Sequence, residues 1–280
     1  MTDDFTPSMT ALLSAAARAA HPIVDDAPHL LDDAVARTLC ETLHPSPLDY
    51  QLAHPEVPVL ASARLSSCVR STYTDDRLRA SDLDQYVMLG AGLDTSAHRL
   101  PDDGTVRTWL LDRPGVLAWR AHLFAQAGLP DAGTPVPCDL GSPRLVADLA
   151  GAGLELSRPA FVTGLGVSMY LDEAAIRRTL AALAPLAPGS QLVLDHILPP
   201  ELRDEQGAAH ATAIAVFAGG AGEPWLCTPT PDVLSSWLDE AGWDVVQQVD
   251  EADATGPHFW PRTDALRPVR LTRLVHAVRR

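Results

Sequence analysis

From Ser81 onward, short apolar runs alternate with stretches of helical pattern, and this alternation constrains the fold more than any other feature. Such an order is typical of βαβ units, whose strands lie side by side in a parallel sheet. The pattern predicts seven strands, at Tyr86–Leu89, Val106–Leu111, Thr134–Pro137, Phe161–Thr163, Gln191–Asp195, Trp243–Val249 and Leu271–Val278.

No helical pattern separates the last two expected strands, so we expect them to pair antiparallel. Helices are expected near Thr95–Leu100, Val116–Ala127, Leu145–Ala150, Glu173–Leu183 and Asp232–Ala241. The predicted fold is therefore α/β, with a Rossmann-like sheet of seven strands of which the last is antiparallel. This arrangement is typical of S-adenosylmethionine (SAM) methyltransferases, whereas an NAD-binding domain keeps its sixth strand parallel.

The first eighty residues have a different pattern. Helices are expected at Thr10–Ala20, Leu30–Leu43 and Leu60–Tyr73, and proline-rich connections separate the second from the third. We interpret residues 1–80 as a helical cap and residues 81–280 as the ligand-binding core, together forming one structural domain, for which 280 residues suffice.

Charge and composition limit the partners. The formal net charge of -15 repels a nucleic-acid backbone, so no nucleic-acid partner is expected. The N-terminus lacks a leader pattern and no apolar run could span a bilayer, which predicts a cytoplasmic protein without a membrane partner. The four cysteines form no C-x-x-C pair, so no metal site is expected. The oligomeric state, monomer or homodimer, stays open.

The first expected strand runs directly into a turn that contains Gly90, Ala91, Gly92 and Asp94. Glycines let the backbone pass close to a ligand, and Asp94 can cap a following helix. Thr95 occupies the position next to Asp94, where a dinucleotide fingerprint favours a third glycine. The turn alone is equally consistent with an ordinary tight connection, and an NAD-dependent oxidoreductase remains an alternative that Thr95 disfavours.

Acidic residues follow the next two expected strands. Asp112 lies 20 residues after Gly92, the spacing at which a carboxylate meets the two hydroxyls of a ribose. Asp139 follows the third strand, where it could accept a hydrogen bond from an adenine amino group. Each could be a solvated strand end, but three successive strand ends that carry the expected groups indicate a nucleoside pocket.

These residues resemble the leucine carboxyl methyltransferase family and its bacterial relatives over nearly the whole chain. The most specific segment is Gln85–Thr95 followed by Arg99-Leu100, and Leu111–Pro114 and Met169-Tyr170-Leu171 are also similar. The resemblance implies SAM as cofactor, S-adenosylhomocysteine as product, and Arg70 as the group that holds the cofactor's carboxylate. The cofactor-binding residues that it implies are Arg70, Gly90, Ala91, Gly92, Asp94, Asp112, Arg113, Cys138, Asp139, Leu140, Gly164 and Leu165.

Two positions depart from the family pattern. Leu165 occupies the place of a glutamate, and Ser96 replaces an arginine. These departures motivate a second alternative, a SAM-binding protein that does not transfer methyl groups or that uses the sulfonium for another reaction.

No hydrolase, metalloprotease or kinase motif appears. Methyl transfer from a sulfonium needs mainly alignment and exclusion of water, and an ionised carboxylate acceptor needs no base. We therefore expect transfer to a small molecule, most simply to a carboxylate oxygen in natural-product tailoring. Tyr170 and His196 are the candidate catalytic residues, and His196 would serve as base for an alcohol or phenol. Apolar helices at Leu12–Ala19 and Ala208–Phe217 are expected to line the substrate pocket.

Overall fold

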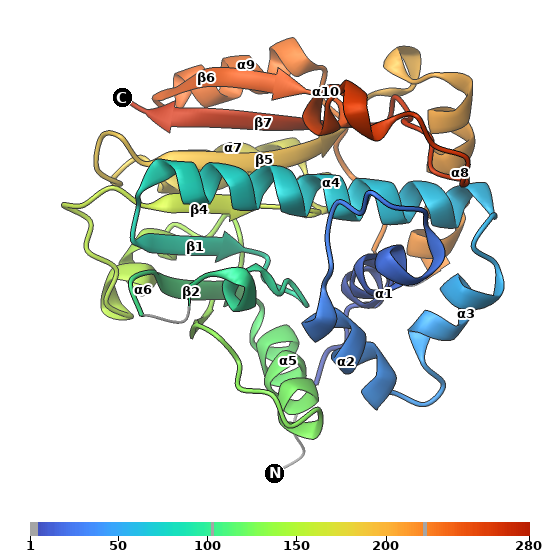
Figure 1. Ribbon diagram of the computed structural model, residues 1–280. Coiled ribbons are helices and arrows are strands. Elements are labelled where there is room, and N and C mark those ends of the chain that lie inside the picture. The colour runs from blue at the N-terminus through green and yellow to red at the C-terminus, as the bar shows by residue number, and fades with distance from the viewer. Residues whose placement is uncertain (1–4, 102–103, 221–222) are drawn as a thin grey trace.

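The sheet of the expected seven strands is present in the structure, a computed structural model that describes residues 5–101, 104–220 and 223–280 (Figure 1). Its spatial order is β3-β2-β1-β4-β5-β7-β6. The strands are β1 (Gln85–Leu89), β2 (Arg107–Asp112), β3 (Thr134–Pro137), β4 (Phe161–Gly164), β5 (Gln191–Ile197), β6 (Trp243–Val249) and β7 (Thr272–Arg279).

Strand β7 lies between β5 and β6 and runs antiparallel to both, whereas β1 to β5 pair parallel. The connection between β6 and β7 is longer than expected, because it contains the short helix α10 (Glu251–Thr255) and the 3₁₀ turn η4 (Pro257–Phe259), which the sequence pattern did not predict. Neither carries the chain across the sheet, so β6 and β7 still pair antiparallel. The predicted fold class is confirmed, including the antiparallel last strand.

Ten α-helices surround this sheet in the described part of the chain. They are α1 (Met9–Val24), α2 (Ala34–Thr42), α3 (Pro47–Ala53), α4 (Pro58–Ser81), α5 (Pro114–Gln126), α6 (Leu145–Gly151), α7 (Glu173–Ala182), α8 (Glu205–Gly220), α9 (Pro231–Glu240) and α10 (Glu251–Thr255). Within the same described residues, no helix joins enough length to enough apolar character to cross a bilayer.

Alternating side chains of the strands supply two apolar layers, one on each face of the sheet. On one face, Val87 of β1 packs with residues of α6, α7 and α9. On the other face, Tyr86 and Met88 pack with α4, whose Leu65 and Val69 are buried. Figure 1 shows α4 lying along this second face. A sheet covered on both faces explains why its strands read as continuous apolar runs.

The cap predicted at 1–80 is not uniform, and its residues 1–4 lie outside the described ones. Helices α1 and α2 form a separate apolar cluster with α5, in which Ala16, Leu39 and Phe124 are buried. Helix α4, in contrast, belongs to the layer that covers the sheet. The sequence did not reveal this difference, because the proline-rich stretch before α4 was interpreted as a connection although it contains the short helix α3.

Several boundaries differ from the expected ones. Helix α2 begins at Ala34 rather than Leu30, because the Asp33 carboxylate accepts a hydrogen bond from the Ala36 amide at 3.0 Å and caps the helix there. The expected helix 95–100 is only a short 3₁₀ turn, η1 (Ser96–Arg99). Strand β5 continues past Asp195 to Ile197, so that the predicted site residue His196 lies inside the strand and not beyond its end.

Candidate active site

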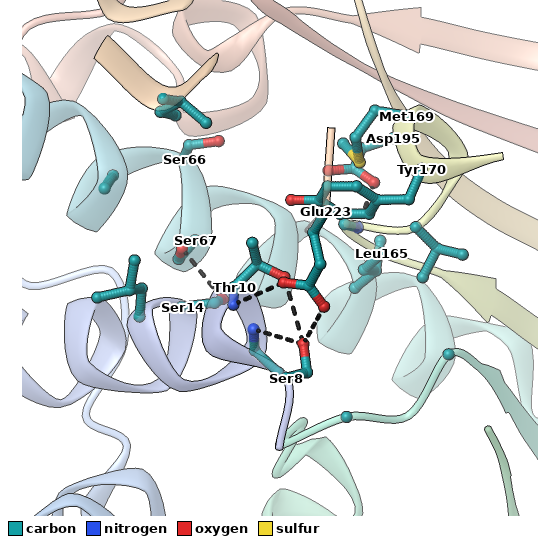
Figure 2. A pocket seen from close by; sticks show the side chains of 18 of the residues that line it. Ser8, Thr10, Ser14, Ser66, Ser67, Leu165, Met169, Tyr170, Asp195 and Glu223 are labelled. Atoms are coloured by element: carbon teal, nitrogen blue, oxygen red, sulfur yellow. Dashed lines mark hydrogen bonds between the residues drawn. The ribbon is translucent and has the colours of Figure 1, made fainter. Parts of the chain in front are cut away.

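A cavity of about 710 Å³ lies at the carboxyl ends of the parallel strands, between the sheet and helices α1, α4 and α8. This is the edge at which ligands bind in open α/β sheets, and the volume is typical of ligand pockets. Figure 2 shows serine side chains of α1 and α4 on one side of the cavity and Tyr170 with Asp195 on the other. The predicted cofactor residues that line the cavity are Arg70, Gly90, Ala91, Gly92, Asp94, Asp112, Arg113, Cys138, Asp139, Leu140 and Leu165.

The glycine turn is held tightly between its neighbours. Gly90 has a φ of +68°, and a Cβ there would come within 2.5 Å of Cγ2 of Val167. The Gly92 amide donates to Oδ2 of Asp112 at 2.8 Å, while Oδ1 of Asp112 accepts from the Arg113 amide at 2.8 Å. Burial raises the pKa of Asp112, and these two amides oppose the shift. Asp112 is therefore both a clamp on the turn and a cavity wall.

Asp94 stabilises the end of the glycine turn through hydrogen bonds with Ser96. Its Oδ1 accepts from the amide and the hydroxyl of Ser96 at 2.7 and 2.6 Å. Burial alone would raise the pKa of Asp94, but the charges of Arg18 and Arg99, with the Ser96 hydrogen bonds, lower it below its usual range. Asp94 thus holds Ser96, the first residue of η1, whereas the N-cap position of η1 is Thr95 and not Asp94 as expected.

A buried network anchors the N-terminal helices to this turn. Asp33 accepts from Nε of Arg18 at 2.8 Å and from the Thr95 hydroxyl at 2.5 Å, and it lies 3.5 Å from Nη1 of Arg99. Arg99 also pairs with Asp75 at 2.7 Å. Burial opposes ionisation of Asp33, but Arg18 and Arg99 lower its pKa to about 2.

Arg70 and Asp195 form an ion pair at the cavity wall. The sequence predicted Arg70 as a site residue but not Asp195. Nη2 of Arg70 donates to the Ser14 hydroxyl at 2.7 Å, and Nη1 lies 3.5 Å from Oδ2 of Asp195. Oδ1 of Asp195 accepts from the Gly166 amide at 2.6 Å. Burial raises the pKa of Asp195, opposed by Arg70. The signal for Asp195 was its place at the end of an expected strand, beside the departure at Leu165.

Two predicted residues are not in the cavity lining. Gly164 is buried in β4 opposite Leu194. His196 follows Asp195 in β5, and because side chains alternate along a strand it faces the other side of the sheet. Burial and the charge of Arg273 lower the pKa of His196 to about 4. The predicted position of His196 at the crevice edge is wrong, because β5 does not end where expected.

Tyr170 does line the cavity, at the end of the short 3₁₀ helix η2 (Ser168–Tyr170). Burial raises the pKa of its hydroxyl, so the group is neutral and can donate a hydrogen bond. Beside it, Glu223 accepts from the Ser8 hydroxyl at 3.0 Å and from the Thr10 amide at 3.1 Å. Figure 2 shows Glu223 between the first turn of α1 and Tyr170. These contacts fasten the segment after α8 over the cavity.

Two buried titratable groups lie on the far wall of the cavity, which α4, α8 and α10 form. Sequence reasoning missed Glu251 and ranked His210 below His196 as a candidate base. Glu251, the first residue of α10, and His210 of α8 both line the cavity. Burial raises the pKa of Glu251 to about 8 and lowers that of His210 to about 4. A single glutamate after a strand belongs to no sequence motif. Only the fold shows that Glu251 lies at the cavity. The expected pocket helices at 12–19 and 208–217 do contribute cavity residues, among them Leu13, Ser14 and Ile214; the side chain of Phe217 lies outside the described ones.

Known proteins with similar sequences were found along most of the chain. A relative from Bacillus subtilis strain 168, provisionally named a SAM-dependent methyltransferase, is 25% identical over 305 aligned residues that cover 98% of both chains. A relative from Mycolicibacterium gilvum with the same provisional name is 34% identical over 171 residues, 58% of this chain. The match spans only about half the length of that relative, 54%.

Solved structures with the same fold include a methyltransferase, also provisionally named, from Thermobifida fusca. Its TM-score is 0.61 at 18% identity, and the match covers 98% of this chain and 96% of that one. A protein of the DUF574 family from Streptomyces avermitilis matches with a TM-score of 0.59 at 17% identity, covering 95% and 97%. At such low identity these likenesses establish the fold alone.

The model of the leucine carboxyl methyltransferase family matches residues 11–184, which is more than half of the 280 residues. The matched range contains α1, α4, the glycine turn, Asp112 and the segment after β4, so it joins the helices over the cavity to the strand ends beneath them. This match argues against the NAD-dependent oxidoreductase that the turn alone left open. The chain belongs to the leucine carboxyl methyltransferase family, a family of SAM-dependent enzymes with this fold.

Proposed function

We propose that this protein transfers the methyl group of SAM to an oxygen atom of a small, largely apolar molecule. The observation that supports this function best is the continuity of the cavity. A single space joins the glycine turn and Asp112 to the far wall that α4, α8 and α10 form. A donor bound at the turn would therefore face an acceptor within the same enclosed volume.

The residues along the strand ends fit SAM in order. Asp139 and Leu140 would contact the adenine and Asp112 the ribose, and all three line the cavity. The methionyl end of SAM carries a carboxylate and an ammonium group, and Arg70 and Asp195 offer the opposite charges 3.5 Å apart. Asp195 would then replace the acid that is missing at Leu165. This argues against the alternative in which the departure at Leu165 abolishes cofactor binding.

The chemistry of SAM reduces what the protein must supply. The sulfonium is already an activated leaving group, so the enzyme needs to align donor and acceptor and to exclude water. The contacts of Glu223 with Ser8 and Thr10 tie the segment after α8 to the start of α1 beside the cavity, which helps to exclude water from it. The neutral hydroxyl of Tyr170 can orient the acceptor.

We assign the acceptor as a carboxylate, which makes the product a methyl ester, in the tailoring of a small natural product. Hydrogen-bond donors on the far wall support a carboxylate: Ser62, Ser66 and Ser67 of α4 line the cavity. The cavity is open to an apolar body as well, because Val59, Leu60 and Ile214 lie beside these serines.

The test is incubation with methyl-labelled SAM and a panel of apolar acids, phenols and short peptides, followed by mild alkali. We expect label on an acid and its release as methanol, since esters hydrolyse under these conditions and ethers do not. Label that survives alkali would contradict the carboxylate assignment. Binding of SAM without turnover to S-adenosylhomocysteine would favour the non-transferring alternative.

A further inference from the structure

Glu251 is a buried carboxyl group whose hydrogen bonding is incomplete. Its side chain is 4% exposed and lines the cavity. Oε2 accepts from the Val269 amide at 3.3 Å, whereas Oε1 has no hydrogen-bond partner among the residues that the structure describes. A buried oxygen without a partner is costly, and at a cavity wall a bound ligand is what completes it.

The surroundings of Glu251 do not provide a counter-ion. The groups that face it are Arg70 on α4, Asp250 at the N-cap of α10, Asp204 before α8 and His210 on α8. Arg70 is already engaged with Ser14 and Asp195, and in the described part of the chain Glu251 makes no ion pair. Burial, with the nearby Asp250 and Asp204, raises the pKa of Glu251 to about 8 against the effects of the Val269 amide and the Ser66 hydroxyl.

A carboxyl group with this pKa is mostly neutral at pH 7, and a neutral carboxyl carries one hydrogen to donate. Ser66 of α4 lies next to it and adds a hydroxyl to the same wall. The wall thus presents hydrogen-bond donors, while the positive charge that faces Glu251, on Arg70, is already paired with Asp195. Such a wall suits an oxygen anion that arrives with an apolar body.

We propose that the carboxyl group of Glu251 donates a hydrogen bond to one oxygen of the acceptor's carboxylate and thereby selects carboxylic acids as substrates. This inference rests on the proposed function, which it extends by naming the residue that recognises the acceptor. Glu251 would touch the substrate without giving up its proton.

The proton distribution follows from the two pKa values. Two adjacent carboxyl groups cannot both ionise without strong repulsion, so one of them keeps a proton. An ordinary small carboxylic acid has a pKa of about 4, well below that of Glu251. The proton stays on Glu251, and the acceptor remains the ionised nucleophile.

The transfer then balances without a base. One acceptor oxygen accepts the hydrogen bond from Glu251, and the other forms the new C–O bond to the methyl carbon. The C–S bond breaks, and its electron pair returns to sulfur to give S-adenosylhomocysteine. No proton is released, and the ester carbonyl can still accept the hydrogen bond of Glu251.

The experiment measures binding, so that it does not depend on turnover. Protein saturated with S-adenosylhomocysteine is titrated calorimetrically with phenylacetate and, as the uncharged match, with 2-phenylethanol, at about pH 6.5 and about pH 9.5. We expect phenylacetate to bind roughly 30-fold more weakly at the higher pH, because the neutral fraction of Glu251 falls by that factor. His210, with its pKa of about 4, stays neutral at both values.

The variants separate the proposed role from packing. Glu251→Gln keeps a donor, so phenylacetate should bind it at both pH values without the 30-fold loss. Glu251→Ala should bind phenylacetate at least about tenfold more weakly at the lower pH. The affinity for S-adenosylhomocysteine should stay unchanged in both, and Glu201→Gln, on the exposed η3 turn (Pro200–Leu202), should match the unchanged protein.

Several results would overturn the inference. They are no binding of phenylacetate at the lower pH, an unaltered pH dependence in Glu251→Gln, or a loss of S-adenosylhomocysteine affinity instead of acceptor affinity. A further contrary result is that 2-phenylethanol binds more tightly at the higher pH and that Glu251→Gln loses this gain. Glu251 would then be a base for hydroxyl acceptors. If phenylacetate binds as expected but no acid in the panel is methylated, the proposed function fails and the binding role of Glu251 stands.

Discussion

The two walls of the cavity differ in how completely their buried titratable groups are matched by hydrogen-bond or ion-pair partners. On the wall of the glycine turn, every charge of the anchoring network has a partner: Asp33 contacts Arg18 and Arg99, and Arg120 donates to the carbonyl oxygens of Gly92 and Asp94 at 3.1 and 2.7 Å. On the far wall, Oε1 of Glu251 and Nδ1 of His210 have no partner among the described residues. A fully paired network fixes one geometry, whereas an incomplete one gains by binding a ligand. The first wall therefore suits a constant cofactor and the second a variable acceptor.

The largest expected effect comes from removing a charge from the wall of the glycine turn, which we call the paired wall because the charges of its anchoring network all have partners. Asp33→Ala leaves Arg18 and Arg99 without their shared carboxylate in a buried position, and we expect a loss of about 3–5 kcal/mol in the free energy of unfolding. Urea unfolding at pH 7 measures it. As a control, Asp76→Ala removes a largely exposed partner of Arg79 and should change stability by less than about 1 kcal/mol. Equal effects of the two changes would contradict the account.

The two walls should also differ in the sign of their pH dependence. Asp33 has a folded pKa of about 2, below its ordinary 3.8, so its contribution is present above about pH 4 and is lost as the pH falls toward 2. Glu251 has a folded pKa of about 8, above its ordinary 4.5, so its contribution is fully present below about pH 4.5, is lost progressively as the pH rises toward 8, and is gone above it.

We expect this loss, which falls between about pH 4.5 and about pH 8, to be on the order of 2–4 kcal/mol in the free protein. Glu251→Gln should abolish it and leave the acid limb unchanged. Thermal or urea unfolding from about pH 3 to about pH 10 measures both limbs. A loss of stability over this pH range that persists in Glu251→Gln would show that another group causes it.

Gly90 tests how closely the turn is packed. Gly90 and Gly128 share a φ of +68°, but only at Gly90 would a Cβ meet another side chain, Val167, within 4 Å. Gly128→Ala should cost about 1 kcal/mol of stability for backbone strain alone. Gly90→Ala should cost about 2–3 kcal/mol and also weaken SAM binding. Equal losses in the two variants would mean that the turn can yield to a side chain.

The smallest expected effect is confined to the cofactor. Asp112→Ala should weaken SAM binding by about 1–3 kcal/mol, because it removes the carboxylate that meets the ribose and clamps the Gly92 amide. The secondary structure should remain, as circular dichroism would show. Unaltered affinity in a folded variant would place the ribose elsewhere.

The sequence predicted the paired wall better than the far wall. The glycine turn, Asp112 and Asp139 lie at strand ends, and strand ends can be located from apolar runs and the turns that follow them. Their spacing follows from the length of a βα unit, and all of them line the cavity.

The far wall depends on how distant segments meet, and no local pattern encodes that. Glu251 reaches the cavity because α10 packs against α4, which is almost two hundred residues earlier in the chain. His196 was placed wrongly because β5 runs two residues beyond its expected end. His196 therefore lies inside the strand, where its side chain points to the face opposite that of Asp195. Helix α4 was assigned to the cap because its contacts with the sheet leave no separate sequence signal.

Calorimetric titration of the unmodified protein with SAM, S-adenosylhomocysteine and NAD tests the central claim most directly, namely that the paired wall is a cofactor site that already has its bound geometry. We predict a single site with micromolar affinity for SAM and for S-adenosylhomocysteine, and no heat with NAD. Heat and a thermal shift with NAD, and none with either sulfur compound, would contradict the account at its base.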